Sequence, residues 1–246
     1  MKHKAFLLGL MVGIVACSGS KKEQPKEASP RPGQEQLVLK SLEREYIEPV
    51  FPEDMAQERT NWQNPDIVLK SFSNLSEKTV ADVGAGAGYF SFKLAQVAQK
   101  VIALDIDPKA LDYIREQKQI VGNWADNIEP RLTPPDVPNL LVNEADAVLV
   151  VNTFCFIPNQ QQYFERLRNG LKPEGELVIV DFKKGNIPVG PADEMKMDAR
   201  TVRSILRKAG YKRISIDEIN DISNRSTTIL KLKDDIKLTS CILCQE

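Results

Sequence analysis

The chain has 246 residues, of which 42% are hydrophobic and 27% charged, and its formal net charge is −1. This is an ordinary globular composition, long enough for one sizeable α/β domain. The near-neutral balance lacks the basic excess that is typical of nucleic-acid binding, so no nucleic-acid partner is predicted.

The first residues are predicted to be an export signal. Lys2 and Lys4 precede the apolar run 5–15, which is too short to span a membrane but suits the core of a signal peptide. The run ends in Ile-Val-Ala-Cys17, which resembles the lipobox of bacterial lipoproteins. This resemblance implies a signal peptide over 1–16, lipidation of Cys17, a lipid anchor in a membrane and a place in the bacterial cell envelope. An ordinary secretory signal or an uncleaved anchor is the alternative.

Two segments precede the predicted domain. Residues 17–36 are rich in Lys, Glu, Pro, Ser and Gly and cannot bury a core, so they are predicted to be a disordered tether. Residues 37–76 have an interrupted helical pattern and are predicted to be a helical N-terminal extension. Because cleavage would remove His3, the only histidine, a histidine base and a histidine metal site are excluded, and no metal is predicted.

The stretch 80–90 organises the rest of the chain. A short apolar run ends in Asp82, three glycines follow at alternate positions (Gly84, Gly86 and Gly88), and a helical pattern comes next. This order predicts a buried strand, a tight glycine turn and an amphipathic helix. Glycine suits such a turn because it adopts positive φ and lets a ligand approach the backbone closely.

The spacing Asp-x-Gly-x-Gly-x-Gly resembles motif I of class I S-adenosylmethionine (SAM) dependent methyltransferases. A dinucleotide-binding fingerprint would place its third glycine at position 89, where Tyr89 stands instead. Another nucleotide or a merely structural turn is the alternative. The resemblance implies that the cofactor SAM is bound by Asp82, Gly84, Ala85, Gly86, Gly88 and Tyr89, although Tyr89 also suits a helix face in the core.

A second strand is predicted over 100–105. It ends in Asp105, 21 residues after Gly84, close to the ~20 expected for an acid that binds ribose hydroxyls. A carboxylate can accept two O–H donors at once. Asp105 and its neighbour Ile106 are therefore assigned to the cofactor. Asp107, before Pro-Lys-Ala, is predicted to be a helix N-cap. A surface carboxylate is the alternative for both acids.

Further positions follow from the family resemblance. The family often places an acid after its third strand to accept the adenine amino group, and Asp136 is the candidate here, with a turn aspartate as the alternative. The apolar run after Asp146 predicts a central strand buried on both faces. Its end resembles motif IV, which implies that Asn152 and Thr153 line the reaction site; a strand-end turn is the alternative. Cys155 stands where many relatives carry histidine, so the catalytic residue is unknown.

The C-terminal third completes the pattern. Residues 171–182 resemble the Leu-Lys-Pro-Gly-Gly turn and fifth strand of the superfamily, with Glu174 in place of one glycine. A helix capped by Asp198 and a strand over 212–218 come next, and the last strand is either 227–232 or 238–243. The pair Cys241 and Cys244 is predicted to be structural or incidental, because neither a helix start nor a second ligand pair accompanies it.

The resemblance implies an α/β fold, a Rossmann-like seven-stranded, mostly parallel sheet with helices on both faces, over a methyltransferase domain spanning 77–246. It implies transfer of a methyl group from SAM to an unidentified small-molecule acceptor. A non-catalytic envelope lipoprotein that binds ligands on the same fold is the alternative, because an exported lipoprotein lies where no SAM is made.

Overall fold

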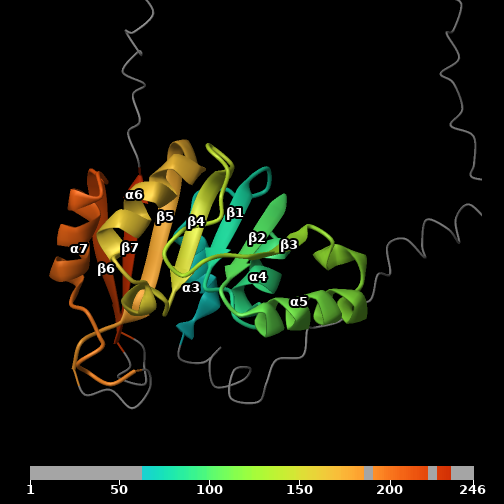
Figure 1. Ribbon diagram of the computed structural model, residues 1–246, viewed down its shortest axis with the longest axis horizontal. Helices are drawn as coiled ribbons and strands as arrows, with labels where there is room; N and C mark the ends of the chain where they lie inside the picture. The colour runs from blue at the N-terminus through green and yellow to red at the C-terminus, as the bar shows by residue number, and fades with distance from the viewer. Residues whose placement is uncertain (1–62, 186–190, 221–225, 234–246) are drawn as a thin grey trace, which may run out of the picture. The chain divides into compact units, whose positions relative to one another are not determined.

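The computed structural model describes residues 63–185, 191–220 and 226–233 (Figure 1). Helices and strands alternate along most of this part of the chain. Their bounds are α3 (Pro65–Lys70), β1 (Thr79–Val83), α4 (Tyr89–Ala95), β2 (Lys100–Asp105), α5 (Pro108–Val121), η1 (Asn123–Ala125), β3 (Ile128–Leu132), β4 (Ala145–Val151), η2 (Phe154–Phe156), α6 (Gln160–Gly170), β5 (Leu171–Phe182), α7 (Ala199–Lys208), β6 (Arg213–Asn220) and β7 (Ser226–Lys233). Within these ranges, no helix has both the length and the apolar character needed to cross a membrane.

The strands form one sheet in the order β3-β2-β1-β4-β5-β7-β6. Strands β1 to β5 pair in parallel, and β7 is antiparallel to both β5 and β6. The α/β fold with a Rossmann-like parallel sheet is therefore confirmed. After β3 the chain crosses back to the other side of β1, so the strand order reverses between β1 and β4. Open α/β sheets bind ligands outside the carboxyl ends of the strands at such a reversal.

Two apolar layers hold the helices on the two faces of the sheet. Successive side chains of a strand point to opposite faces. On β4, Leu149 packs in the layer that contains Phe92 of α4, whereas Val148 and Val150 pack in the layer that contains Phe164 of α6. Because helices cover both faces, every residue of the strand after Asp146 is apolar and buried. Figure 1 shows α6 and α7 side by side next to the strands β4 to β7.

The predicted helix caps are confirmed. The Asp107 carboxylate accepts a hydrogen bond from the Lys109 amide at 2.9 Å, and Pro108 occupies the first helical position of α5. The Asp198 carboxylate accepts the amides of Arg200 and Thr201, each at 3.0 Å, at the start of α7. These caps satisfy backbone donors that have no partner within their own helix.

The C-terminal part of the sheet bears on two features of the sequence interpretation. Within the described residues the last strand is β7, which corresponds to the first of the two alternatives, 227–232. Glu174 has φ of 62°, in the left-handed region that glycine prefers, at the position where it replaces a glycine of the motif that this segment resembles. The segment 238–243, the pair Cys241 and Cys244, and the helical extension before residue 63 lie outside the described residues, and so does Cys17.

Candidate ligand site at the carboxyl edge of the sheet

The chain leaves β1 in a tight bend that packs against the turn after β4. Gly84 has φ of 74°, and its amide donates a hydrogen bond to the Leu104 carbonyl of β2 at 2.9 Å. A Cβ atom on Gly84 would lie 2.2 Å from the Oγ1 atom and 2.9 Å from the Cβ atom of Thr153. Glycine is therefore required by both the backbone conformation and the close approach of these two segments.

Gly86, two residues later, has a different environment. Its φ is 54°, but a Cβ atom there would meet no heavy atom within 4 Å. Its amide donates a hydrogen bond to the Oδ2 atom of Asp105 at 2.7 Å. The bend is therefore attached to the tip of β2 while one side of it stays open.

Asp105 joins the bend to the loop after β2. Its Oδ2 atom accepts the Gly86 amide, and its Oδ1 atom accepts the Asp107 amide at 2.9 Å. A carboxylate has about four lone-pair sites, so these two bonds leave each oxygen able to accept another donor. The structure thus brings the acid of the second strand next to the glycine bend, as the sequence predicted.

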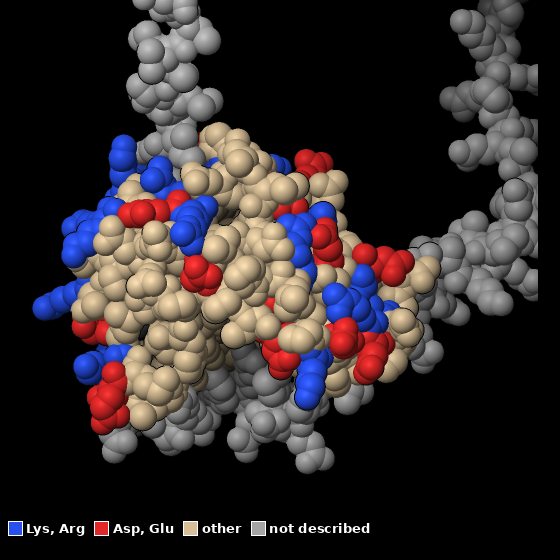
Figure 2. Space-filling view, viewed as in Figure 1, with Lys and Arg blue, Asp and Glu red and all other residues tan. Residues whose placement is uncertain are grey.

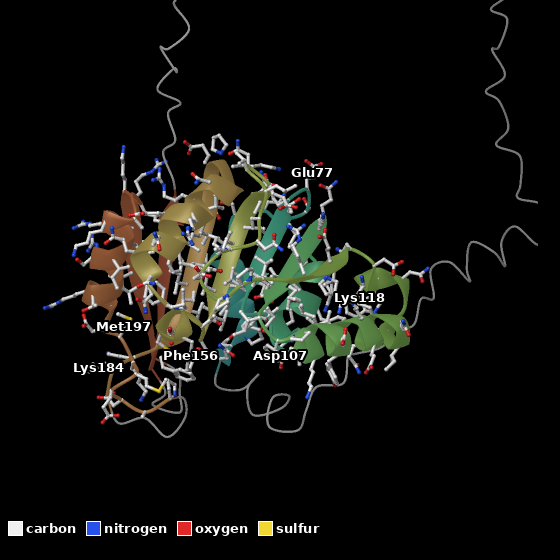
Figure 3. All side chains as sticks on the ribbon, in the orientation of Figure 1. Glu77, Asp107, Lys118, Phe156, Lys184 and Met197 are labelled. Atoms are coloured by element: carbon white, nitrogen blue, oxygen red, sulfur yellow. The ribbon has the colours of Figure 1, made fainter. Side chains whose placement is uncertain are left out.

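A cavity of about 240 Å³ opens beside this pair. Its walls come from the ends of β1 to β4 and from α6, and most of them are apolar. The lining residues are Val83, Gly84, Asp105, Ile106, Thr133, Pro134, Pro135, Thr153, Phe156 and Tyr163. In Figure 3 the labelled Phe156 and Asp107 lie at one edge of the sheet and Glu77 at the opposite edge. The cavity therefore occupies the carboxyl edge at the point where the strand order reverses.

Asp82 and Tyr89, predicted to bind the cofactor, are buried in the core and do not line this cavity. Asp82 is 2% exposed, and its carboxylate accepts a hydrogen bond from the Ser91 hydroxyl at 2.7 Å. Tyr89 is also 2% exposed, and its ring packs edge-on against Phe90. The hydrogen bond between Asp82 and Ser91 connects β1 to α4, and the Tyr89 ring packs α4 against the sheet. Both residues therefore stabilise the elements on either side of the bend. Ala85, which is 8% exposed, likewise belongs to the core.

Asp136 also lies outside the cavity walls. The Asp136 carboxylate is 3.6 Å from the Arg166 guanidinium, and the same guanidinium donates a hydrogen bond to the backbone carbonyl of Asp136. Because the Thr133 hydroxyl donates a hydrogen bond to the Val137 carbonyl at 2.6 Å, the loop folds back on itself. Thr133 and the two prolines after it thus form the wall, and the position of Asp136 gives no support to its predicted contact with adenine.

Of the two residues predicted after β4, the structure brings one to the cavity. The Thr153 hydroxyl donates a hydrogen bond to the Val151 carbonyl at 2.8 Å, and the residue lines the cavity. Asn152 is not a lining residue; its φ is 52°, and its amide donates to the Val180 carbonyl of β5 at 2.8 Å. Asn152 therefore sets the turn that presents Thr153.

Asp181, at the end of β5, is an acid that the sequence interpretation did not single out. Its carboxylate accepts hydrogen bonds from the amides of Phe182, at 2.8 Å, and Cys155. Burial nevertheless raises the pKa of Asp181 to about 6. Burial and the nearby Asp181 charge also raise the pKa of the Cys155 thiol to about 11, so this cysteine is protonated at neutral pH.

The raised pKa of Asp181 predicts a specific pH dependence of stability. Because the folded-state pKa lies above the ordinary value of 3.8, the Asp181 carboxyl lowers the stability of the wild type as the pH rises from about 4 to about 6, and Asp181→Asn lacks this contribution. The free energy of unfolding of the variant should therefore increase relative to the wild type by roughly 2–3 kcal/mol over this range. Urea unfolding at pH 4, 5, 6 and 7 measures it. A difference that stays constant with pH would contradict the assignment.

The loop that forms the cavity wall is anchored by a partly buried ion pair. The Arg131 guanidinium makes two hydrogen bonds of 2.8 Å to the carboxylate of Glu144, and one of 2.9 Å to the Asn139 carbonyl. The hydrogen bonds from Arg131 hold the pKa of Glu144 down to about 2. This ion pair connects β3 to the residue that precedes β4. It therefore holds together the two ends of the segment that carries Thr133.

Replacing Glu144 with glutamine is expected to lower the free energy of unfolding at pH 7 by about 1–3 kcal/mol, because the pair is partly buried and bidentate. Since the folded-state pKa of Glu144 is depressed, the loss should be complete above about pH 4.5 and should shrink as the pH falls towards 2. Glu129→Gln is the matched control. Glu129 contacts the same Arg131 but is 41% exposed, so its loss should stay below about 1 kcal/mol. Urea unfolding at pH 7 and pH 3 measures both. Equal losses would contradict this account.

Comparison with known proteins gives a consistent result. Residues 81–179 match a family model described as a methyltransferase domain. A SAM-dependent methyltransferase structure from Aquifex aeolicus superposes with a TM-score of 0.65 at 26% identity, covering 72% of this chain and 92% of that one. The matched region runs from β1 to β5 and includes the bend, Asp105 and the cavity.

Two curated relatives carry different names. A tRNA U34 carboxymethyltransferase from Cellvibrio japonicus is 28% identical over 167 residues, which are 63% of this chain and 51% of the relative. An arsenite methyltransferase from Halobacterium salinarum is 29% identical over 168 residues, 60% of this chain and 41% of the relative. The chain thus spans about half the length of the curated relatives it matches. These similarities support a methyltransferase domain with the class I fold and leave the acceptor open.

Proposed function

We propose that this protein is a SAM-dependent methyltransferase that binds its cofactor at the cavity beside β1 and β2 and methylates a small molecule. One observation carries the proposal. The open, positive-φ bend at Gly86 is hydrogen-bonded to the Asp105 carboxylate at the rim of a mostly apolar cavity, within the region that matches the methyltransferase domain.

The residues present fit SAM. The free lone pairs of Asp105 suit the ribose hydroxyls, and the apolar side chains of Ile106, Pro134 and Phe156 suit the faces of a base. The open side of Gly86 leaves the backbone accessible to the rest of the cofactor. When bound, SAM supplies a methyl group already activated by the sulfonium charge. The protein's main task is then alignment, which is worth on the order of 7–11 kcal/mol in well-oriented reactions.

We assign Asp181, which does not line the cavity but accepts a hydrogen bond from the Cys155 amide in the turn that carries Thr153, as the group that receives the proton of a neutral acceptor. It lies at the carboxyl end of β5, next to the turn after β4, and its pKa of about 6 suits a base at neutral pH. This assignment predicts a rate that falls as the pH drops below about 6 and an Asp181→Asn variant that lacks this dependence.

The distribution of charge favours a small acceptor over RNA. Figure 2 shows Lys and Arg gathered towards α7, whose sequence carries Arg200, Arg203, Arg207 and Lys208 and no acid. Helix α7 contributes no residue to the cavity walls. The phosphates of a tRNA could bind these cations, but because α7 does not line the cavity, such binding would not by itself bring a nucleotide into it. The names of the relatives include a tRNA enzyme, and the test below therefore includes tRNA.

A labelling screen tests the proposal. The full chain is incubated with SAM that carries a deuterated methyl group, together with metabolite extract in one arm and total tRNA in the other, and Asp105→Ala is the blank. We expect a labelled methyl group on a small molecule in the wild-type reaction only. Label on tRNA alone would overturn the small-molecule assignment, and no label in either arm would favour the non-catalytic binding module.

We further propose that Cys17 is lipidated and anchors the protein in the bacterial cell envelope. The support is the sequence alone: two lysines, an apolar run of signal-peptide length and the lipobox-like residues before Cys17. A Cys17→Ser variant is expected to lose its partition into the membrane fraction. A variant that still partitions with membranes would remove the lipid anchor from the account.

A further inference from the structure

Tyr163 of α6 is a buried side chain with an unused hydroxyl. The residue is 2% exposed, and its ring lies edge-on to Phe164 at a centroid distance of 5.5 Å. Within the described part of the chain, no group makes a hydrogen bond to its hydroxyl, and burial alone raises the pKa of the phenol well above its usual range. Because Tyr163 lines the cavity beside Asp105, its hydroxyl can form a hydrogen bond with a ligand held there.

Comparable hydroxyls nearby are all bonded within the protein. Tyr211, the other fully buried tyrosine next to α6, donates to the Phe164 carbonyl at 3.2 Å. The Thr133 and Thr153 hydroxyls, on the cavity walls, donate to backbone carbonyls at 2.6 and 2.8 Å. Tyr163 lines the same cavity, so the cavity is where its hydrogen bond is available.

We propose that the Tyr163 hydroxyl accepts a hydrogen bond from the 6-amino group of the base of the bound cofactor, an inference that rests on the proposed function. A phenol both donates and accepts, so it suits a ring nitrogen or the exocyclic amino group. Asp136, the acid predicted for this contact, lies outside the cavity, paired with Arg166.

The arrangement of the walls places the base rather than the acceptor next to Tyr163. Ile106 and Phe156 are 61% and 58% exposed and border the cavity, as flanks for a flat heterocycle would. Asp105, the ribose ligand, lies on the same wall as Ile106. Asp181, which marks the acceptor side, is not among the lining residues.

Calorimetric titration of the full chain with S-adenosylhomocysteine tests the assignment. Tyr163→Phe should bind roughly 3–10-fold more weakly than the wild type, the usual effect of one neutral hydrogen bond. Tyr211→Phe is the matched control, since it removes a buried hydroxyl outside the cavity, and its affinity should stay within about twofold of the wild type. Tyr163→Phe should also melt no lower than the wild type without ligand, because no protein contact is lost.

The purine riboside analogue of S-adenosylhomocysteine, which has a hydrogen in place of the 6-amino group, provides the second arm. The wild type should prefer the adenosyl compound, and Tyr163→Phe should lose most of that preference. Unchanged affinity in Tyr163→Phe, or equal weakening for both compounds, would overturn the inference while leaving cofactor binding intact. A wild type that binds neither compound would overturn the inference and the proposed function together.

Discussion

An alanine at position 84 is expected to lower the free energy of unfolding by roughly 2–5 kcal/mol. The backbone there has φ of 74°, which costs an L-residue about 1–2 kcal/mol. The added methyl group would lie within 3 Å of three Thr153 atoms, including its Cβ, so rotating that side chain does not remove the clash. Crowding of this kind typically costs about 1–3 kcal/mol more. Urea or thermal unfolding measures the loss.

Gly86→Ala is the control for this prediction. It has a similar φ of 54° but open space around the added methyl group, so it should cost only about 1–2 kcal/mol in stability. The methyl group would project into the side of the bend that we assign to the cofactor, so its main effect should be weaker SAM binding. Thr153→Ala should restore part of the stability of Gly84→Ala and none of Gly86→Ala. Equal destabilisation by the two alanines would contradict the packing described for the bend.

Replacing Asp105 with alanine is expected to weaken SAM binding by roughly 100-fold or more. Two hydrogen bonds to a charged acceptor are worth about 1.5–3 kcal/mol each, and every 1.4 kcal/mol is tenfold. The change also removes the acceptor of the Gly86 amide, so the bend loses its attachment to β2. Calorimetric titration with SAM measures the affinity.

Asp107→Asn provides the matched control. It removes a carboxylate two residues away, but asparagine caps a helix about as well as aspartate, so α5 should keep its start. Its SAM affinity should stay within about threefold of the wild type, a difference below 1 kcal/mol. An Asp105→Ala variant that binds SAM as tightly as Asp107→Asn would show that the cofactor lies elsewhere.

Local sequence patterns predicted much of this architecture because the interactions that form these elements join residues close together in the sequence. The order of apolar run, glycines and helix fixed β1, the bend and α4, and the acid 21 residues later marked the tip of β2. The caps at Asp107 and Asp198 depend only on residues within one turn of each helix. The Rossmann-like order of the strands then brought Asp105 to the bend.

Other site residues could not be predicted, because tertiary packing decides them. Tyr89 follows the bend directly, yet the helix turns its ring into the core. The prolines after Thr133 fold their loop so that Asp136 faces Arg166. Tyr163 has the spacing of an ordinary core residue, and only the cavity reveals its free hydroxyl. Asp181 could have been noticed in the sequence, because it stands at the end of an apolar strand, as Asp105 does. The sequence interpretation did not use this pattern.

The most direct test of the account is a calorimetric titration of SAM into the full chain. The account predicts one SAM bound per chain with a dissociation constant below about 1 mM, the upper end of ordinary enzyme affinities. S-adenosylhomocysteine should compete for the same site. No binding heat up to millimolar SAM, in a chain whose unfolding transition shows that it is folded, would contradict the assignment of the cavity.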